Sequence, residues 1–361
     1  MNPDKPNRPH YPALDGLRGL CCLLVIFYHT FYFVLEKYLS FIWVSIDIFF
    51  VLSGFLITDI LLNLNLNKKS IFTFYIKRGL RVFPLYYLSL ILFFIILPVL
   101  SINTLNVDYY KQNQVWFWSF LQNWLMIFNP PKESSLVHLW SMAVEEQFYL
   151  LWPLIILFVK KPKRLLLIII TLLLAVIAFR FWIWDIKIEK IEYGNLYSFT
   201  RIDGICVGCI VALLKKINPG YINKRIAIIV LTIAGLNFLF YYLNRESSMP
   251  YFGLIGFFTF SIVVGILVDE IINNENSIFS KIFRFPPLRF IGKISYGTYI
   301  FHLPVYLAFK PYVESWAASH IEEIPPPYFA SGVLTILSFI IGYLSYKYFE
   351  IHFLRLKQKL E

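Results

Sequence analysis

Residues 165–184 read LLLIIITLLLAVIAFRFWIW, an apolar stretch in which Arg180 is the one charged side chain. Twenty such residues, at 1.5 Å per residue in a helix, match the roughly 30 Å hydrocarbon core of a bilayer. Stretches of this kind recur along the chain. They predict ten membrane spans at about 17–37, 41–63, 82–101, 138–159, 165–184, 199–214, 225–243, 251–270, 290–313 and 329–349. The predicted fold is therefore all-α and polytopic.

The composition of the whole chain agrees with this prediction. Of its 361 residues, 58% are hydrophobic and 15% are charged, and the mean hydropathy is +0.64. Soluble domains carry about 25% charged residues, so a soluble enzyme and a disordered chain are both excluded. We expect one transmembrane domain over residues 1–361, with its core at about 10–350 and no additional soluble domain. The polar, Pro-rich residues 1–13 predict no cleavable signal peptide.

The net charge of +11 is informative about membrane topology, because the cations are unevenly distributed along the chain. Most of the 33 lysines and arginines fall in segments that lie on one side of the ten predicted spans: 5–18, 68–81, 160–164, 215–225, 281–293 and 347–359. Cytoplasmic loops carry such an excess of positive charge. We therefore expect both termini in the cytoplasm. Because the basic charge is spread over separate places, nucleic acid is not an expected partner.

Two further features of the sequence predict structure rather than chemistry. The stretch 115–128 is apolar but too short to span, so we expect a surface-lying or re-entrant helix there. The four cysteines (Cys21, Cys22, Cys206 and Cys209) all lie in apolar runs, and although Cys206 and Cys209 have the spacing of a metal or redox pair, we expect small buried side chains. No metal site is predicted.

Two histidines fall near the middle of predicted spans, where ionisable groups are costly and often functional. His29 lies about 12 residues beyond the inner end of the first span, roughly 18 Å deep, and His302 lies at the same depth in the ninth. Imidazoles at this depth suit proton transfer at neutral pH. The alternative is that each histidine is simply hydrogen-bonded between helices.

A second set of ionisable residues populates the outer half of the predicted spans. It consists of Asp47, Glu145, Glu146, Arg201 and Asp203. Adjacent residues on a helix are about 100° apart, so at most one of the two glutamates can face a shared site squarely. These residues predict either a polar cavity open to the outside or mutually satisfied ion pairs, such as Arg201 with one of the glutamates.

Three cations gather at the inner face. Lys77, Arg78 and Arg81 lie in the stretch 71–83, which we expect to be a short connection, and Pro84 is a natural first residue of the next helix. Positions 77 and 81 share a helical face. Such a cluster suits phosphate binding, where arginine gives bidentate contacts. The alternative is binding to anionic lipid headgroups.

These features fit either a proton-coupled transporter of a polar substrate or an enzyme that joins a cytoplasmic phosphate-bearing donor to an outer acceptor. Six motifs separate the two. They are LDGLRG at 14–19 with His29, DIFFVLSGFL at 47–56, KRGLRVFP at 77–84, HLWSMAVEEQFY at 138–149, RIDG at 201–204, and GKISYG at 292–297 with His302 and Pro304. In these motifs and their order the chain resembles the membrane-bound acyltransferase-3 family, whose bacterial members O-acylate cell-surface carbohydrates.

The resemblance implies an O-acyltransferase that uses acyl-CoA, chiefly acetyl-CoA, as co-substrate and holds no permanent cofactor. It implies a catalytic set of His29 as general base with Arg18, Asp47 and Glu145. It implies donor binding by Lys77, Arg78, Arg81, Ser295 and Tyr296, and an acceptor pocket of Glu146, Arg201, Asp203 and His302. Direct transfer to the acceptor needs fewer assumptions than an acyl-enzyme, because Cys21 and Cys22 lie about 11 Å along the helix from His29.

The partners implied are acyl-CoA, a saccharide or glycolipid acceptor and the lipids of the bacterial inner (cytoplasmic) membrane. The sequence leaves the acceptor open among lipid-linked glycan, the O-antigen of lipopolysaccharide, capsule, exopolysaccharide and peptidoglycan. It also leaves open the oligomeric state and the group that stabilises the oxyanion.

Overall fold

The structure, a computed structural model, describes residues 11–65, 67–99, 108–131, 135–185, 198–219, 224–243 and 255–360. Within these ranges every regular element is a helix and no strand occurs, which confirms the predicted all-α class. The chain forms two compact units. Unit 1 comprises Met1–Leu14, Ile46–Ile71 and Ser141–Phe285, and unit 2 comprises Asp15–Ser45, Phe72–Trp140 and Pro286–Glu361.

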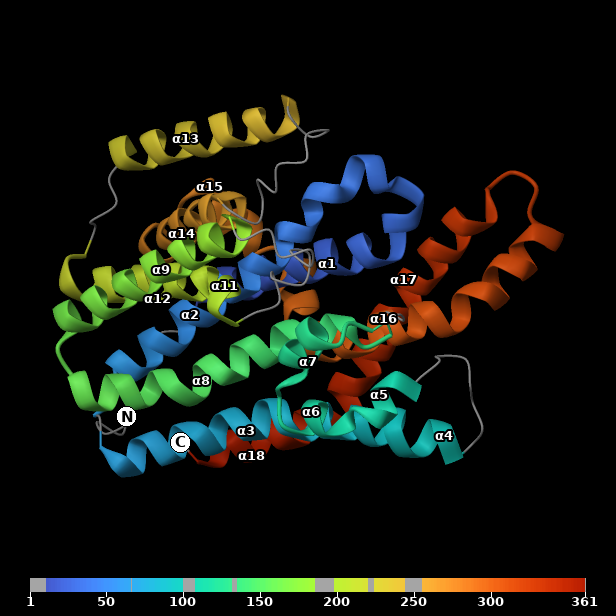
Figure 1. The fold of residues 1–361 in the computed structure, drawn as a ribbon, viewed down its shortest axis with the longest axis horizontal. Helices are drawn as coiled ribbons and strands as arrows, with labels where there is room; N and C mark the ends of the chain where they lie inside the picture. The colour runs from blue at the N-terminus through green and yellow to red at the C-terminus, as the bar shows by residue number, and fades with distance from the viewer. Residues whose placement is uncertain are drawn as a thin grey trace. The chain divides into compact units, whose positions relative to one another are not determined.

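Unit 1 is organised around helix α12 (Asp203–Ile217). This helix packs against α2 (Ile46–Leu62), α9 (Pro162–Asp185) and α14 (Phe257–Asn273). The unit is completed by α8 (Trp140–Val159), α11 (Ser198–Arg201), α13 (Lys224–Leu243) and α15 (Ile278–Phe283), all visible in Figure 1.

Glycines allow α12 to touch α2 directly. Gly204 and Gly208 lie one turn apart on α12, and a Cβ atom at Gly208 would lie 2.0 Å from the Val51 carbonyl oxygen of α2. A small residue at every fourth position is the usual device for close helix packing in membranes. Between these glycines, Cys206 is buried, and the neighbouring Cys209 thiol accepts a 3.1 Å hydrogen bond from Thr58. All four cysteines are free and buried, as the sequence predicts.

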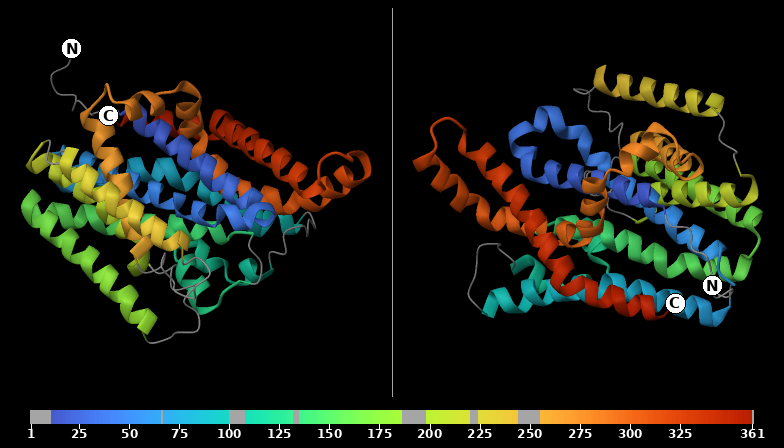
Figure 2. Two further views of the ribbon diagram at one scale, coloured as in Figure 1. Left: turned by 90° about the horizontal axis from the view of Figure 1, so that it is seen from above. Right: turned by 180° about the vertical axis from the view of Figure 1, so that it is seen from behind.

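Unit 2 contains the longest helix described, α16 (Pro286–His320), which forms a hairpin with α17 (Pro326–Ser345). Figures 1 and 2 show these two helices side by side. Helix α17 continues through a π-helical turn, Tyr346–Glu350, into α18 (Ile351–Lys359). Unit 2 also contains α1 (Pro12–Leu39) from Asp15 onward and α3 (Lys68–Ile91) from Phe72 onward. Its remaining elements are the 3-10 turn Ser40–Ser45, the π segment Leu92–Ile96, α4 (Leu97–Val99), α5 (Asp108–Gln112), α6 (Gln114–Trp118), α7 (Gln122–Phe128) and the 3-10 turn Val137–Leu139.

Helices α1 and α16 cross at a pair of glycines. A Cβ atom at Gly19 would lie 2.0 Å from the carbonyl oxygen of Leu288, and one at Gly292 would lie 1.9 Å from that of Asp15. No side chain fits between backbones this close, because real Cβ contacts are almost never under 3.0 Å. The crossing therefore fixes the register of α1 against α16.

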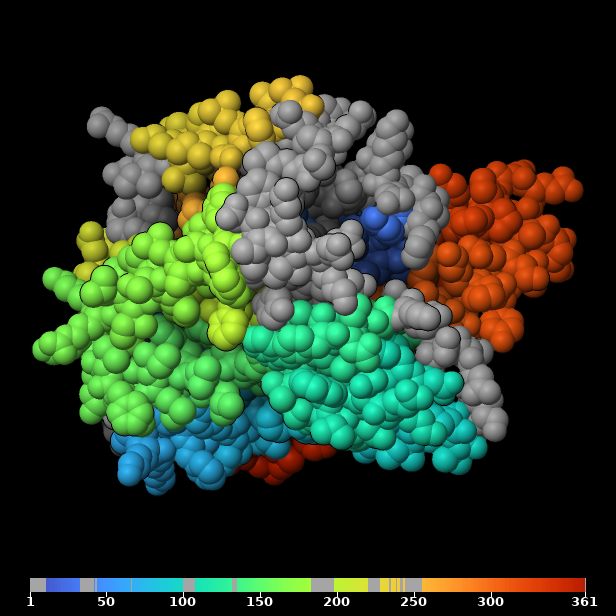
Figure 3. All heavy atoms as spheres, viewed as in Figure 1, coloured from blue at the N-terminus to red at the C-terminus, as the bar shows by residue number. Residues whose placement is uncertain are grey.

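In the part of the chain that the structure describes, five helical stretches are long and apolar enough to cross a membrane: Pro12–Tyr32, Lys68–Val99, Val137–Val159, Pro162–Trp182 and Pro326–Lys359. Large apolar side chains of α9, including Leu167, Leu174 and Trp182, are exposed, and Figure 3 shows α8 and α9 in green at the surface. A bilayer would cover such a surface. The chain is thus a multi-pass membrane protein, while the count of ten spans and the cytoplasmic termini stay predictions.

The structure corrects two boundaries drawn from the sequence. Residues 71–83 are not a connection, because α3 begins at Lys68 and runs through them, and Pro84 lies inside the helix rather than at its start. The stretch 115–128 is not one helix, since α6 and α7 are separated by a turn in which Phe120 has a φ of 55°. The polar residues 1–10, with Lys5 and Arg8, and residues 100–101 and 251–254 of two predicted spans lie outside the described residues.

The glycine crossing predicts a substitution with a large effect. In Gly292→Ala the new methyl group would meet the Asp15 carbonyl, so α1 and α16 must separate, at a cost of about 1–3 kcal/mol for overpacking. We expect a lower melting temperature of the purified protein in detergent. Gly332→Ala on α17 is the control, because nothing lies within 4 Å of a Cβ there. Equal melting temperatures of the two variants would contradict the close contact of α1 and α16 at Gly292.

Candidate active site

Three buried or half-buried histidines meet in unit 2. The Nδ1 atom of His29 on α1 lies 2.9 Å from the Nε2 atom of His302 on α16, which is a hydrogen-bond distance. The ring of His138, just before α8, has its centroid 4.9 Å from that of His302. The two histidines that the sequence places at equal depth therefore contact each other, and a third lies against them.

A proline in α16 explains how His138 is held. Pro304 has no N–H, so it cannot bond to the carbonyl of Ile300 four residues earlier as a helix requires. That carbonyl lies 3.1 Å from Nε2 of His138 and accepts its proton. In return, the Tyr299 hydroxyl donates a 2.6 Å hydrogen bond to the backbone carbonyl of His138. This reciprocal pair ties the 3-10 turn Val137–Leu139 to the turn of α16 that precedes His302.

His138 is the residue of this cluster that sequence reasoning missed. It opens the motif HLWSMAVEEQFY, and the hydropathy pattern marks it only as the first residue of a predicted span. The available signal was Pro304, which leaves a carbonyl in a buried helix without its usual partner and so calls for a donor elsewhere in the chain.

The α1 side of the cluster is held by α17. The hydroxyl groups of Thr30 and Thr335 are 2.8 Å apart, and Ser331 donates a 2.6 Å hydrogen bond to the Thr30 carbonyl. Thr30 is the residue after His29, so these bonds restrain the backbone that carries the imidazole. His29 is therefore positioned by both helices of the α16–α17 hairpin.

The predicted donor residues also lie in unit 2, on α3. Lys77 and Arg81 are one turn apart, and Lys77 is 7% exposed. The Tyr296 hydroxyl donates a 2.6 Å hydrogen bond to the carbonyl of Val82, which brings the GKISYG segment of α16 to this turn. Glu350 lies within electrostatic reach of Arg81 and accepts a 2.9 Å hydrogen bond from Ser345. The cations are thus built into a packed helix.

Two other predicted residues are engaged within their own helices. The Ser295 hydroxyl donates to the Gly292 carbonyl at 2.9 Å. Arg18 contacts Asp15 at 3.4 Å and is partly exposed. Because the hydroxyl protons of both Ser295 and Tyr296 go to backbone carbonyls, the structure does not direct either of them at a ligand as a donor.

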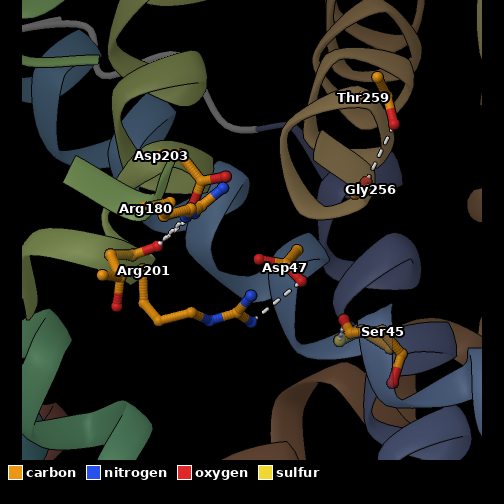
Figure 4. A network of polar contacts seen from close by, with 9 residues as sticks. Ser45, Asp47, Arg180, Arg201, Asp203, Gly256 and Thr259 are labelled. Atoms are coloured by element: carbon orange, nitrogen blue, oxygen red, sulfur yellow. Dashed lines mark hydrogen bonds and ion pairs between the residues drawn. The ribbon is translucent and has the colours of Figure 1, made fainter. Parts of the chain in front are cut away.

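The charged residues of the predicted outer pocket lie in unit 1 and form buried ion pairs, shown in Figure 4. Arg201 lies 3.1 Å from Asp47, and Arg180 lies 2.7 Å from Asp203. Asp47 and Asp203 occupy the first turns of α2 and α12, where the helix dipole stabilises negative charge. This is the ion-pair alternative that the sequence left open, with Asp47 as the partner of Arg201.

The glutamates of α8 differ from these pairs in exposure. Glu145 and Glu146 are half-buried. The carboxylate of Glu145 accepts hydrogen bonds from Ser53 at 3.0 Å and from Tyr149 at 3.2 Å. The predicted base therefore belongs to unit 2 and the predicted acceptor carboxylates to unit 1, so a single site made from both stays a prediction. Among the described residues, no group of three His, Cys, Asp or Glu is arranged to hold a metal ion.

Comparison with known proteins defines the class of this chain. The family model Acyl_transf_3, described as an acyltransferase domain, matches residues 11–347. The chain therefore belongs to the acyltransferase-3 family, which confirms the resemblance and the enzyme class predicted from the six motifs. No solved structure gives a significant match.

Several curated proteins are similar to almost the whole chain. A peptidoglycan O-acetyltransferase, OatA, from Listeria monocytogenes is 31% identical over 95% of this chain and 56% of its own length. An O-acetyltransferase OatA from Staphylococcus aureus is 29% identical over 96% of this chain and 58% of its own length. The putative peptidoglycan O-acetyltransferase YrhL from Bacillus subtilis is 29% identical over 94% and 54%. The chain spans about half the length of these relatives.

The buried pair in unit 1 predicts an asymmetric response to substitution. Asp47→Asn removes the charge that balances Arg201, and breaking a buried pair in this way costs about 3–5 kcal/mol. Replacing both partners, as Asp47→Leu with Arg201→Met, should cost less, because no unbalanced charge remains. Thermal unfolding in detergent measures both. A double variant that is less stable than Asp47→Asn would show that the pair is not the stabilising unit.

Proposed function

We propose that this chain is an O-acetyltransferase that moves an acetyl group from cytoplasmic acetyl-CoA to a hydroxyl group of a saccharide on the outer side of the membrane. Family membership supports the reaction class. The names of the relatives support acetyl as the group and a peptidoglycan-type saccharide as the acceptor. The observation that carries the proposal is a hydrogen-bonded histidine pair, His29 and His302, inside an acyltransferase domain.

In the proposed reaction His29 is the general base. It takes the proton of the acceptor hydroxyl while the hydroxyl oxygen attacks the carbonyl carbon of the thioester. The carbon–sulfur bond then breaks, and the departing thiolate of CoA receives the proton from His29. The products are an ester and free CoA, with no change in oxidation state and no enzyme-bound acyl group.

The donor would be bound by the cations of α3. Three positive side chains within two turns, Lys77, Arg78 and Arg81, suit the phosphate groups of CoA. With both termini in the cytoplasm, as the charge bias predicts, this turn lies on the cytoplasmic side where acyl-CoA is found. Because the three cations lie on a helix that is already formed, no loop would have to fold when CoA binds.

The saccharide acceptor would contact the half-buried carboxylates of α8 rather than the buried ion pairs of unit 1. Glu145 and Glu146 retain exposed surface. Asp47 and Asp203 have none, and their charges are balanced by Arg201 and Arg180, respectively. We therefore assign Glu145 and Glu146 to the saccharide, and we assign the buried pairs to holding α2, α9, α11 and α12 in place around them.

Loss of His29 tests the proposed base. His29→Ala should lower turnover by about 10²–10⁴-fold, the usual contribution of a general base, without lowering the folded yield. Ester formation from labelled acetyl-CoA and a saccharide, assayed with purified protein in detergent, measures this. His320→Ala, an exposed histidine at the end of α16, is the matched control. A turnover of His29→Ala close to that of the unsubstituted protein would refute the assignment of His29 as general base.

The same assay separates the enzyme from a transporter. An acetyltransferase forms ester and free CoA in detergent solution. A proton-coupled transporter needs sealed vesicles and leaves the thioester intact. Intact acetyl-CoA in detergent, together with uptake of saccharide into vesicles, would replace the proposed function.

Substitution of the α3 arginines tests the donor site. Each charge-assisted hydrogen bond is worth about 1.5–3 kcal/mol, so Arg78→Ala or Arg81→Ala should raise the dissociation constant of CoA about tenfold or more. Lys69→Ala, an exposed lysine at the start of α3, is the control for lost charge. If the arginines instead bind lipid headgroups, both variants will bind CoA as the parent does and will insert less well.

A further inference from the structure

The hydrogen bonds of His302 determine which of its ring nitrogens carries a proton. Its Nδ1 atom lies 2.7 Å from the backbone carbonyl oxygen of Tyr299. A carbonyl oxygen only accepts hydrogen bonds, so Nδ1 of His302 must be the donor. Assigning the proton from the hydrogen-bond partners is the standard way to choose a tautomer.

The surroundings of His302 indicate a neutral ring. The side chain has no exposed surface. The groups that face it within the described part of unit 2 are the Tyr299 carbonyl and the rings of His29, His138 and Tyr299, and none of them carries a negative charge. A buried cation without an anion nearby is costly. A neutral imidazole has one proton, so Nε2 of His302 must be an acceptor.

The tautomer of His29 follows from that of His302. Since Nε2 of His302 accepts, the His29 atom 2.9 Å away, Nδ1, must carry a proton and donate it. The lone pair of His29 is then on Nε2, the ring nitrogen on the side away from His302. We propose that His302 is a positioning residue that holds His29 in the Nδ1–H form and thereby makes Nε2 the base nitrogen. This inference rests on the proposed function.

The arrangement also decides where the proton goes. When Nε2 of His29 takes the acceptor's proton, the ring becomes an imidazolium whose Nδ1–H still donates to His302. The proton cannot move on through His302, because the far nitrogen of that ring already bears a proton directed at a carbonyl, which cannot take it. His29 therefore keeps the proton until the CoA thiolate collects it.

His138 supports the positioning residue from the other side. Its Nε2–H donates to the Ile300 carbonyl, and its own carbonyl accepts from Tyr299, so two residues of the turn before His302 are tied to His138. Because the Tyr299 carbonyl is the acceptor for His302, fixing Tyr299 fixes the ring. The chain of positioning runs from His138 through Tyr299 and His302 to His29.

Two substitutions at one position test the proposal. The amide of glutamine reaches the place of the imidazole Nε2, so in His302→Gln its oxygen can accept from His29. The shorter amide of His302→Asn reaches only the place of Nδ1 and removes the His302 acceptor, so that the Val25 backbone is the hydrogen-bond partner that remains for the His29 ring. We expect kcat to fall about 10- to 100-fold in His302→Asn, by analogy with the loss of the hydrogen-bond partner that orients a metal-binding histidine.

The comparison of the two variants distinguishes positioning from general stability. His302→Gln should keep kcat within a few fold of the parent, and KM for acetyl-CoA should be unchanged in both variants. His320→Gln on the same helix is the control. Equal loss of kcat in the Gln and Asn variants, or a loss that appears in KM alone, would overturn the proposal.

A second measurement does not depend on activity. The chain has six histidines, so ring-15N labelling with assignment by single substitutions gives the protonation of each nitrogen by NMR. We expect His29 to be protonated at Nδ1 and bare at Nε2, and to lose this preference in His302→Asn. A His29 protonated at Nε2, or a His302 protonated at both nitrogens, would overturn the proposal. If the tautomers are as expected but the unsubstituted protein makes no ester, the proposed acetyltransferase function is wrong, while the orientation of His29 by His302 still holds.

Discussion

The direct contact of the α1 and α16 backbones at Gly19 and Gly292 is the constraint on which the rest of unit 2 depends. His29 lies ten residues beyond Gly19, and His302 lies ten residues beyond Gly292. With 1.5 Å per residue, both imidazoles sit about 15 Å from the crossing, so two helices that run in the same direction must bring them to one level. Even a methyl group at either glycine would separate the backbones, and a 2.9 Å hydrogen bond does not survive a shift of an ångström.

Unit 1 uses the same backbone contact for a different purpose. Gly204 and Gly208 bring α12 onto α2, and this places the N-terminal carboxylates of the two helices, Asp47 and Asp203, in the interior. Buried carboxylates need both a dipole and a counter-charge, because desolvation alone costs several kcal/mol per ion. Arg201 and Arg180 supply the charge, and the Phe257 ring lies 3.8 Å from the Arg201 guanidinium carbon. Unit 1 thus buries balanced charges, whereas the histidine cluster of unit 2 buries neutral rings.

The sequence predicts what depends on spacing along one helix and misses what depends on contacts between helices. The all-α class and the equal depth of His29 and His302 follow from hydropathy and a constant rise per residue. The start of α3 does not, because Pro84 is read as a boundary in water but is tolerated inside a packed membrane helix. The partner of Arg201 and the role of His138 were out of reach for a related reason. Each bonds to a residue more than 150 positions away, Asp47 and Ile300 respectively, and only tertiary packing selects those partners.

For the proposed base, His29, orientation by another histidine has an advantage over orientation by a carboxylate. In a serine hydrolase triad, an aspartate fixes the tautomer of the histidine and balances the imidazolium that forms. In a hydrocarbon environment that aspartate would bring a permanent charge, which must itself be solvated or paired, as the ion pairs of unit 1 show. His302 fixes the same tautomer with no net charge, and its own orientation comes from a backbone carbonyl that the helix already contains. The resting histidine pair is then neutral, and the positive charge that His29 gains in the proposed reaction is matched by the negative charge of the oxyanion and of the departing thiolate.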